Sequence, residues 1–130
     1  MAASSALDDI GACVFDAYGT IFDFAAAAAR CRDELGDKAD ALSDLWRTKQ
    51  LQYTWLRSLM GSYADFWQVT GEALDFALAA TGIDNPDLRT RLMALYRELD
   101  TFTEVTDTLT RLKAAGMKTA ILSNGSPDML

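Results

Sequence analysis

The chain has 130 residues, the length of one ordinary domain, and half of them are apolar while 24% are charged, as is typical of a soluble globular protein. The formal net charge of −7 argues against a nucleic acid or an acidic membrane as partner, because both require a basic surface. The chain contains no histidine, which excludes His-based general bases, Ser-His-Asp triads and His-ligated zinc. A nucleophile here must act as a carboxylate or through another activation.

The two cysteines, Cys13 and Cys31, are too few for a disulfide framework and lack CxxC spacing. Cys13 lies in an apolar run and is expected to be a small buried side chain. Residues 1–9 have neither a basic segment nor a long apolar stretch, so no signal peptide is expected. No apolar run reaches the about 18 residues of a membrane span, and the expected location is the cytoplasm.

Two short apolar runs predict the strands of a parallel sheet. Residues 12–15 lead into Asp16 and are followed by the break Tyr18-Gly19-Thr20. Residues 119–122 lead into Ser123-Asn124-Gly125 in the same way. Continuous apolar runs of this length are typical of strands buried on both faces. Both polar turns should therefore lie at the carboxyl edge of one sheet, where open α/β sheets place their sites.

The sequence between the two runs predicts helices only. The alanine run 25–29 favours a helix through its high helix propensity. Gly82 is predicted to cap one helix at its C-terminus, and Asn85-Pro86 to begin the next. The predicted helices cover residues 24–36, 40–60, 65–81, 85–99 and 104–115.

The helix predicted at residues 40–60 is apolar on two faces, which indicates that it is sandwiched between two other elements. Arg47 lies on the second face, and two interpretations remain for it. Either α-helical residues around it form core and the charged end of the Arg47 side chain reaches solvent, or Arg47 lies at the wall of a cavity. The first face consists of Leu42, Trp46, Tyr53, Leu56 and Met60, and the second of Arg47, Leu51 and Trp55.

Three segments resemble the haloacid dehalogenase superfamily. Residues 16–23, Asp-Ala-Tyr-Gly-Thr-Ile-Phe-Asp, resemble its first motif, and residues 123–127, Ser-Asn-Gly-Ser-Pro, its second. Residues 45–57 are similar to the cap of the 2-haloacid dehalogenases. The resemblance implies an α/β fold in which a Rossmann-like core (residues 1–20 and 100–130) carries an inserted α-helical cap (residues 21–99). The family's C-terminal half of the core, with a lysine and an Asn/Asp region, is expected to lie beyond these residues.

Tyr18 favours a dehalogenase over a phosphatase within this superfamily. Its phosphoryl-transferring members use Asp-x-Asp, in which the second aspartate protonates the leaving group beside a Mg²⁺. A tyrosine phenol, with a pKa of about 10, is a poor substitute for that acid. A halide leaves as a stable anion and needs no proton, so no metal or other cofactor is expected. A Mg²⁺-dependent phosphatase, and an inactive fragment or binding module, remain as alternatives.

The resemblance also implies a mechanism and a set of site residues. Asp16 would attack C2 of a short L-2-haloalkanoic acid to form an aspartyl ester, and water would release a D-2-hydroxy acid. A homodimer through the helical cap is expected as well. The resemblance further implies that Ser123 and the N–H near Ala17 bind the substrate carboxylate and that Arg47 and Asn124 bind the halide. Thr20 would orient Asp16, and Tyr18, Leu51 and Phe66 would contact the substrate.

Plain structural roles are the alternative for several of these residues. Thr20 is equally typical of a turn, and Ser123 and Asn124 of a helix cap. Leu51 and Phe66 are more often core than pocket. Asp23 is expected to be a turn or cap residue.

Overall fold

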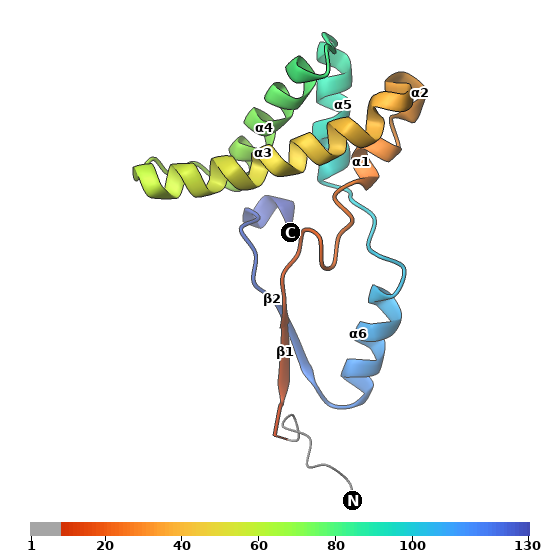
Figure 1. The fold of residues 1–130 in the computed structure, drawn as a ribbon. Coiled ribbons are helices and arrows are strands. Elements are labelled where there is room, and N and C mark those ends of the chain that lie inside the picture. Colours follow the sequence, from red (N-terminus) through yellow and green to blue (C-terminus); the bar gives the residue numbers. More distant parts are fainter. Residues whose placement is uncertain (1–8) are drawn as a thin grey trace, which may run out of the picture. The chain divides into compact units, whose positions relative to one another are not determined.

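A computed structural model describes residues 9–130, and the chain divides into two compact units, each described here by itself (Figure 1). The strand unit consists of residues 9–22 and 101–123, and the helical unit of residues 23–100 and 124–130. The prediction that residues 1–9 form no signal peptide falls, except at Asp9, outside the described residues. Residues 124–130, predicted to belong with the strands, have their contacts in the helical unit.

Two parallel strands, β1 (Ala12–Phe15) and β2 (Lys118–Ile121), form the sheet of the strand unit. Phe15 is paired with Ile121, and the N–H of Leu122 donates to the Phe15 carbonyl at 2.8 Å. The helix α6 (Val105–Ala114) precedes β2 and packs on it. The prediction of two parallel strands is confirmed, with β2 beginning one residue before the predicted range 119–122.

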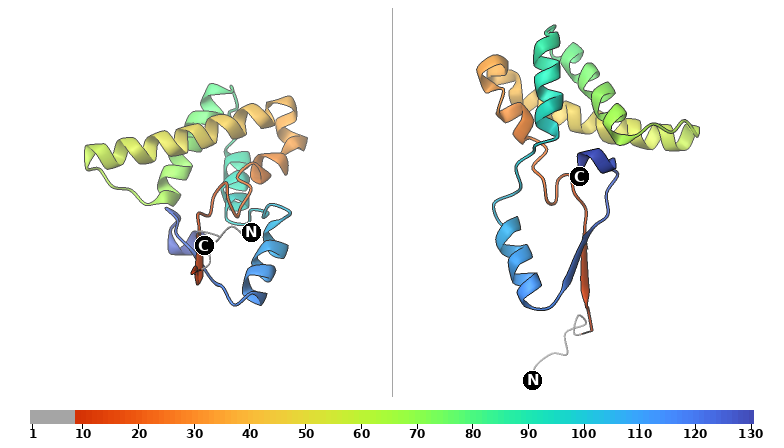
Figure 2. Two further views of the ribbon diagram at one scale, coloured as in Figure 1. Left: turned by 60° about the horizontal axis from the view of Figure 1, so that its bottom comes forward. Right: turned by 180° about the vertical axis from the view of Figure 1, so that it is seen from behind.

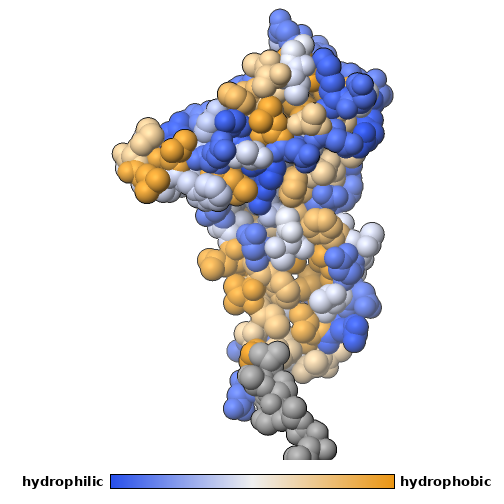
Figure 3. All heavy atoms as spheres, viewed as in Figure 1, coloured by the Kyte–Doolittle hydropathy of each residue, from blue (hydrophilic) through white to orange (hydrophobic). Residues whose placement is uncertain are grey.

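The strands are not buried on both faces, and this part of the prediction is wrong. Val14 is 62% exposed and Leu122 75% exposed, and Cys13 is only half-buried. Burial on both faces requires helices above and below the sheet, and within residues 9–130 only α6 accompanies the strands. The space-filling view shows the apolar surface that the strands leave uncovered (Figure 3).

The helical unit consists of helices joined by short turns, and Figure 2 shows them from two further sides. None of the described helices is long and apolar enough to span a membrane. The elements are α1 (Ala26–Ala29), α2 (Arg32–Leu35), the 3₁₀ turn η1 (Gly36–Lys38), α3 (Ala39–Met60), α4 (Phe66–Ala80), α5 (Pro86–Tyr96) and the 3₁₀ turn η2 (Pro127–Met129).

The single helix predicted at residues 24–36 is two short helices, α1 and α2. The chain leaves the helical conformation at Cys31, whose φ is −107° and ψ is 19°. Cys31 and the alanines Ala26, Ala27 and Ala28 are all buried. Alanine propensity favours helix equally along the run, and packing against the rest of the unit decides where the helix bends.

Side-chain caps determine where α4 and α5 begin, as predicted for Asn85 but not for Asp65. The Asp65 carboxylate accepts the N–H of Gln68 at 2.8 Å, and the Asn85 side chain accepts the N–H of Leu88 at 3.1 Å. Such caps satisfy donors that the first helical turn leaves unpaired. Gly82, with φ of 71°, follows α4 as predicted. The helix α5 ends at Tyr96, before the predicted Leu99.

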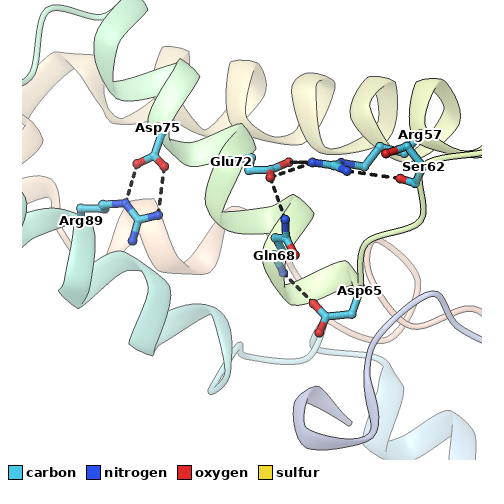
Figure 4. Close-up of polar contacts among 7 residues, drawn as sticks. All are labelled: Arg57, Ser62, Asp65, Gln68, Glu72, Asp75 and Arg89. Carbon is cyan, nitrogen blue, oxygen red and sulfur yellow. Dashed lines mark hydrogen bonds and ion pairs between the residues drawn. The ribbon is translucent and has the colours of Figure 1, made fainter. Parts of the chain in front are cut away.

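Ion pairs tie the helices together at the surface (Figure 4). Arg57 of α3 pairs with Glu72 of α4 at 2.8 Å and also donates to the Ser62 carbonyl at 3.2 Å. Arg89 of α5 pairs with Asp75 of α4. The helices α3 and α4 thus pack along each other around buried Leu42 and Leu74.

The interpretation of α3 as a sandwiched helix holds only for its first half. Leu42 and Trp46 are buried, but Leu59 is 85% exposed and Met60 71% exposed. Trp55 and Leu56 are exposed as well. Apolar periodicity predicts that a face is apolar and not what covers it. We refer to these exposed residues, Trp55, Leu56, Leu59 and Met60, as the α3 end patch; Figure 3 shows the apolar surface there.

Candidate functional site

The carboxyl ends of both strands carry the predicted polar residues. Asp16 directly follows β1 and is exposed. Because the parallel register continues from Phe15 to Leu122, Ser123 lies at the same edge of the sheet as Asp16. The prediction that the two turns share the carboxyl edge is therefore confirmed. Open α/β sheets bind ligands at this edge.

The loop after Asp16 is held by one carbonyl group. The Ala17 carbonyl accepts the N–H groups of Thr20 at 3.2 Å, Ile21 at 2.8 Å and Phe22 at 3.0 Å. Gly19 has a φ of 92°, a conformation that residues with a Cβ rarely adopt. This compact turn keeps Asp16 exposed at the end of the strand while Ala17 is fully buried.

Tyr18 is buried and remains a neutral phenol. Desolvation by burial raises its pKa above the usual 10.0, since burial disfavours the charged form. Its ring packs against Phe22 with 6.0 Å between the ring centroids. A group with this pKa is a poor proton donor to a leaving group at neutral pH.

Thr20 is exposed and lies beside α6. It lines a shallow hollow of about 110 Å³ with Glu104, Thr108 and Leu109. In the part of the chain that the structure describes, no hydrogen bond joins its hydroxyl to Asp16. Its orienting role stays a prediction.

Arg47 is half-buried in the helical unit. Its Nη1 donates to Gln50 Oε1 at 2.9 Å, and its Cζ lies 5.1 Å from the centroid of the Phe24 ring. Arg47 lines a narrow hollow together with Phe24, Trp46 and Gln50. Arg47 is thus packed among neighbouring side chains and does not extend freely to solvent. Its place at the wall of a substrate cavity stays a prediction.

A larger hollow of about 270 Å³ brings Phe66 and Asn124 together. Arg57 and Tyr63 also line it, whereas Arg47 and Leu51 are not on its wall. A neighbouring hollow of about 360 Å³ again includes Phe66 and Asn124. A phenyl ring beside an amide offers one apolar and one hydrogen-bonding wall, as small-molecule sites do.

Asp23 is a turn residue, as expected: its Oδ1 accepts the N–H of Ala25 at 3.0 Å.

The predicted site residues fall into two groups. The strand unit holds Asp16, Ala17, Tyr18, Thr20 and Ser123, and the helical unit holds Arg47, Leu51, Phe66 and Asn124.

Sequence reasoning missed the polar residues around Arg47. Gln50 and Thr70 are buried, and the Gln50 amide bonds to the hydroxyls of Thr70 and Tyr96. A signal existed, because Gln50 follows Trp46 by one helical turn and so shares its buried face. A polar residue on a buried face must find a hydrogen-bond partner. Among the described residues no cluster of Cys, Asp and Glu suits a metal ion.

Comparison with known proteins identifies the class. The family model of the haloacid dehalogenase-like hydrolases matches residues 10–130, and the chain belongs to this family. It is 53% identical over 125 residues to (S)-2-haloacid dehalogenase 1 of Pseudomonas sp. (strain CBS-3), covering 95% of this chain and 55% of that protein. It is 52% identical to (S)-2-haloacid dehalogenase 4A of Burkholderia cepacia, with coverages of 95% and 54%.

Solved structures of dehalogenases have the same fold as this chain. The crystal structure of a dehalogenase matches with a TM-score of 0.90 and 51% identity, covering 94% of this chain and 54% of that one. The L-2-haloacid dehalogenase of Xanthobacter autotrophicus with chloropropionic acid covalently bound matches with a TM-score of 0.81 and 41% identity, with coverages of 92% and 49%. The fold is therefore that of the haloacid dehalogenases. The chain spans about half the length of these relatives.

Proposed function

We propose that the whole protein is a hydrolase acting on carbon–halide bonds, which converts short L-2-haloalkanoic acids to D-2-hydroxy acids and halide. The observation that carries the proposal is the exposed Asp16 at the carboxyl edge, followed by the buried phenol of Tyr18. A carboxylate nucleophile without an adjacent acid suits a leaving group that needs no proton. Relatives about half identical to the chain, named (S)-2-haloacid dehalogenases, support the same substrate class.

The proposed reaction has two steps. An Asp16 carboxylate oxygen attacks C2 from the side opposite the halogen, the carbon–halogen bond breaks, and its electron pair leaves with the halide. Water then attacks the carbonyl carbon of the aspartyl ester, so that the hydroxy acid departs and the Asp16 carboxylate is restored. The covalently bound chloropropionic acid of the Xanthobacter autotrophicus enzyme supports a covalent intermediate.

The remaining site residues have complementary roles in the proposal. Ser123 and the N–H near Ala17 bind the substrate carboxylate, and Thr20 orients Asp16. Arg47 and Asn124 stabilise the departing halide, because donors aimed at a developing charge act mainly in the transition state. Tyr18, Leu51 and Phe66 contact the rest of the substrate. Phe66 and Asn124, which share one hollow, support this division into apolar and polar contacts.

Asp16→Asn in the whole protein tests the proposal. The amide is not a competent nucleophile, so chloride release from L-2-chloropropionate should stop. Asp23→Asn is the matched control, since among the described residues the Asp23 carboxylate accepts only the Ala25 N–H and an amide oxygen can replace that bond. Chloride release by Asp16→Asn would contradict the assignment of Asp16 as the nucleophile. A wild-type protein without halide release would favour a binding module instead.

The proposal includes a homodimer through the helical region, and a cytoplasmic location stays a prediction from the sequence. The α3 end patch supports the dimer, because large exposed apolar surfaces mark interaction sites. Its four apolar side chains lie within the last turns of one helix. A second copy of the chain would remove them from water.

A further inference from the structure

The side chain of Gln50 connects Arg47 to the neighbouring helix α4. Gln50 is 1% exposed and Thr70 is fully buried. Gln50 Nε2 donates to Thr70 Oγ1 at 2.8 Å, and Gln50 Oε1 accepts from Arg47 Nη1 at 2.9 Å. One amide thus bonds to the guanidinium on one side and to a hydroxyl of another helix on the other.

The hydroxyl of Thr70 determines which way this amide points. Its single proton goes to the Phe66 carbonyl at 2.6 Å, so Oγ1 can only accept a further hydrogen bond. The amide nitrogen of Gln50 must therefore face Thr70, and its oxygen must face Arg47. In the reverse orientation an N–H₂ group would face the N–H groups of the guanidinium.

Other buried contacts keep Gln50 and Thr70 in place. The Tyr96 hydroxyl lies 3.0 Å from Gln50 Nε2 and 3.2 Å from Oε1. Trp46 Nε1 donates to the Thr70 carbonyl at 2.9 Å, and the Trp46 and Tyr96 rings have centroids 5.0 Å apart. Buried polar groups with satisfied hydrogen bonds fix one conformation.

From these contacts we propose that Gln50 is a positioning residue for Arg47, with Thr70 fixing the orientation of its amide; the inference rests on the proposed halide-binding role of Arg47. A neutral amide oxygen holds the guanidinium without cancelling its positive charge. A carboxylate at the same place would pair with Arg47 and compete with the halide. The chain from the Phe66 carbonyl through Thr70 and Gln50 therefore holds the guanidinium in one orientation.

The test measures kcat, KM and product inhibition by bromide with L-2-bromopropionate in the whole protein. Gln50→Met keeps the size of the side chain and removes the hydrogen bonds of its amide to Arg47, Thr70 and Tyr96. We expect kcat to fall and the inhibition constant for bromide to rise by about tenfold each, a fraction of the ~10²-fold loss for removing a charge-stabilising donor outright. Thr70→Val should weaken bromide inhibition in the same direction, and Thr70→Ser should retain it.

Gln50→Glu provides a readout that a structural role would not change. Its carboxylate should weaken bromide inhibition further at neutral pH, and inhibition should recover at low pH, where a protonated carboxyl can replace the amide. Thermal unfolding of each variant gives the folded fraction for correction.

Arg47→Ala, measured in parallel, distinguishes a failure of the halide-binding role of Arg47 from a failure of the positioning role of Gln50. If it leaves bromide inhibition unchanged, the halide role of Arg47 and the role of Gln50 both fail. The alternative outcome is that Arg47→Ala abolishes inhibition by bromide, while folded Gln50→Met and Gln50→Glu are inhibited by bromide as strongly as wild type at every pH. That outcome would overturn only the positioning role of Gln50.

Discussion

The ion pair between Arg57 and Glu72 should stabilise the wall of the Phe66–Asn124 hollow in a pH-dependent way. Arg57 Nη2 lies 2.8 Å and 2.9 Å from the two Glu72 carboxylate oxygens, and Gln68 Nε2 donates to the same carboxylate at 3.0 Å. The Gln68 amide, followed by the Arg57 guanidinium, holds the pKa of Glu72 below its usual 4.5. The charged form of Glu72 is therefore favoured in the folded protein.

Replacing Glu72 by glutamine removes this charge at nearly constant size. The Glu72 side chain is 36% exposed and that of Arg57 27% exposed, so solvent screens the pair. We expect a loss in the free energy of unfolding of about 1 kcal/mol near pH 7, the upper end for exposed ion pairs, because the geometry is bidentate.

The stabilisation should depend on pH with a definite sign. Because the folded pKa of Glu72 is lowered, the stabilisation is complete above the usual pKa of 4.5 and disappears as pH falls through the lower folded value. Urea unfolding of the whole protein and of Glu72→Gln, between pH 7 and pH 3, measures the difference.

Glu98→Gln is the control for Glu72→Gln, since Glu98 is exposed and has no ion pair among residues 9–130. Its stability should stay within about 0.5 kcal/mol of wild type throughout. A stability difference for Glu72→Gln that persists undiminished at pH 3 would refute the electrostatic origin.

Three further measurements follow from the proposed function and the proposed homodimer. Arg47→Ala should lower kcat by at least ~10²-fold in steady-state kinetics, because it removes a charge-stabilising donor; a change smaller than twofold would contradict halide binding by Arg47. Hydrolysis of L-2-chloropropionate should survive EDTA, with no p-nitrophenyl phosphate hydrolysis when Mg²⁺ is added, since halide leaves unprotonated; EDTA-sensitive phosphate release without halide release would support a phosphatase. Leu59→Glu in the α3 end patch should convert a dimer into a monomer, as measured by light scattering, because a charge there opposes burial. Thr90→Glu, at an exposed position of α5, should leave the dimer intact.

The strands and most helix ends were predictable because local chemistry defines them. The apolar run before Asp16 predicted β1 at its observed bounds. Asn85 predicted where α5 begins, since it provides a side-chain oxygen for an unpaired N–H group. The parallel pairing also predicted that Asp16 and Ser123 share one edge.

The predictions that were wrong or missing concern which elements pack against a given surface. Sequence periodicity placed Leu56 and Met60 on one face of α3 with Leu42, yet only the first turns of that face are buried. Alanine propensity gave no sign of the bend at Cys31. The spacing of Gln50 from Trp46 indicates a buried polar residue, but the partners of Gln50, Thr70 and Tyr96, come from other helices. Such contacts depend on tertiary structure that residue spacing does not encode.

The uncovered strands have a consequence for anyone who handles these 130 residues as a separate polypeptide. The backbone groups of β1 and β2 that are not paired with each other point outward beside exposed Val14, Ile121 and Leu122. An open edge flanked by β-branched and aliphatic side chains is a template for another strand. In a concentrated preparation the nearest such strand belongs to a neighbouring molecule. Purification at low concentration would therefore limit aggregation through intermolecular β-strand pairing.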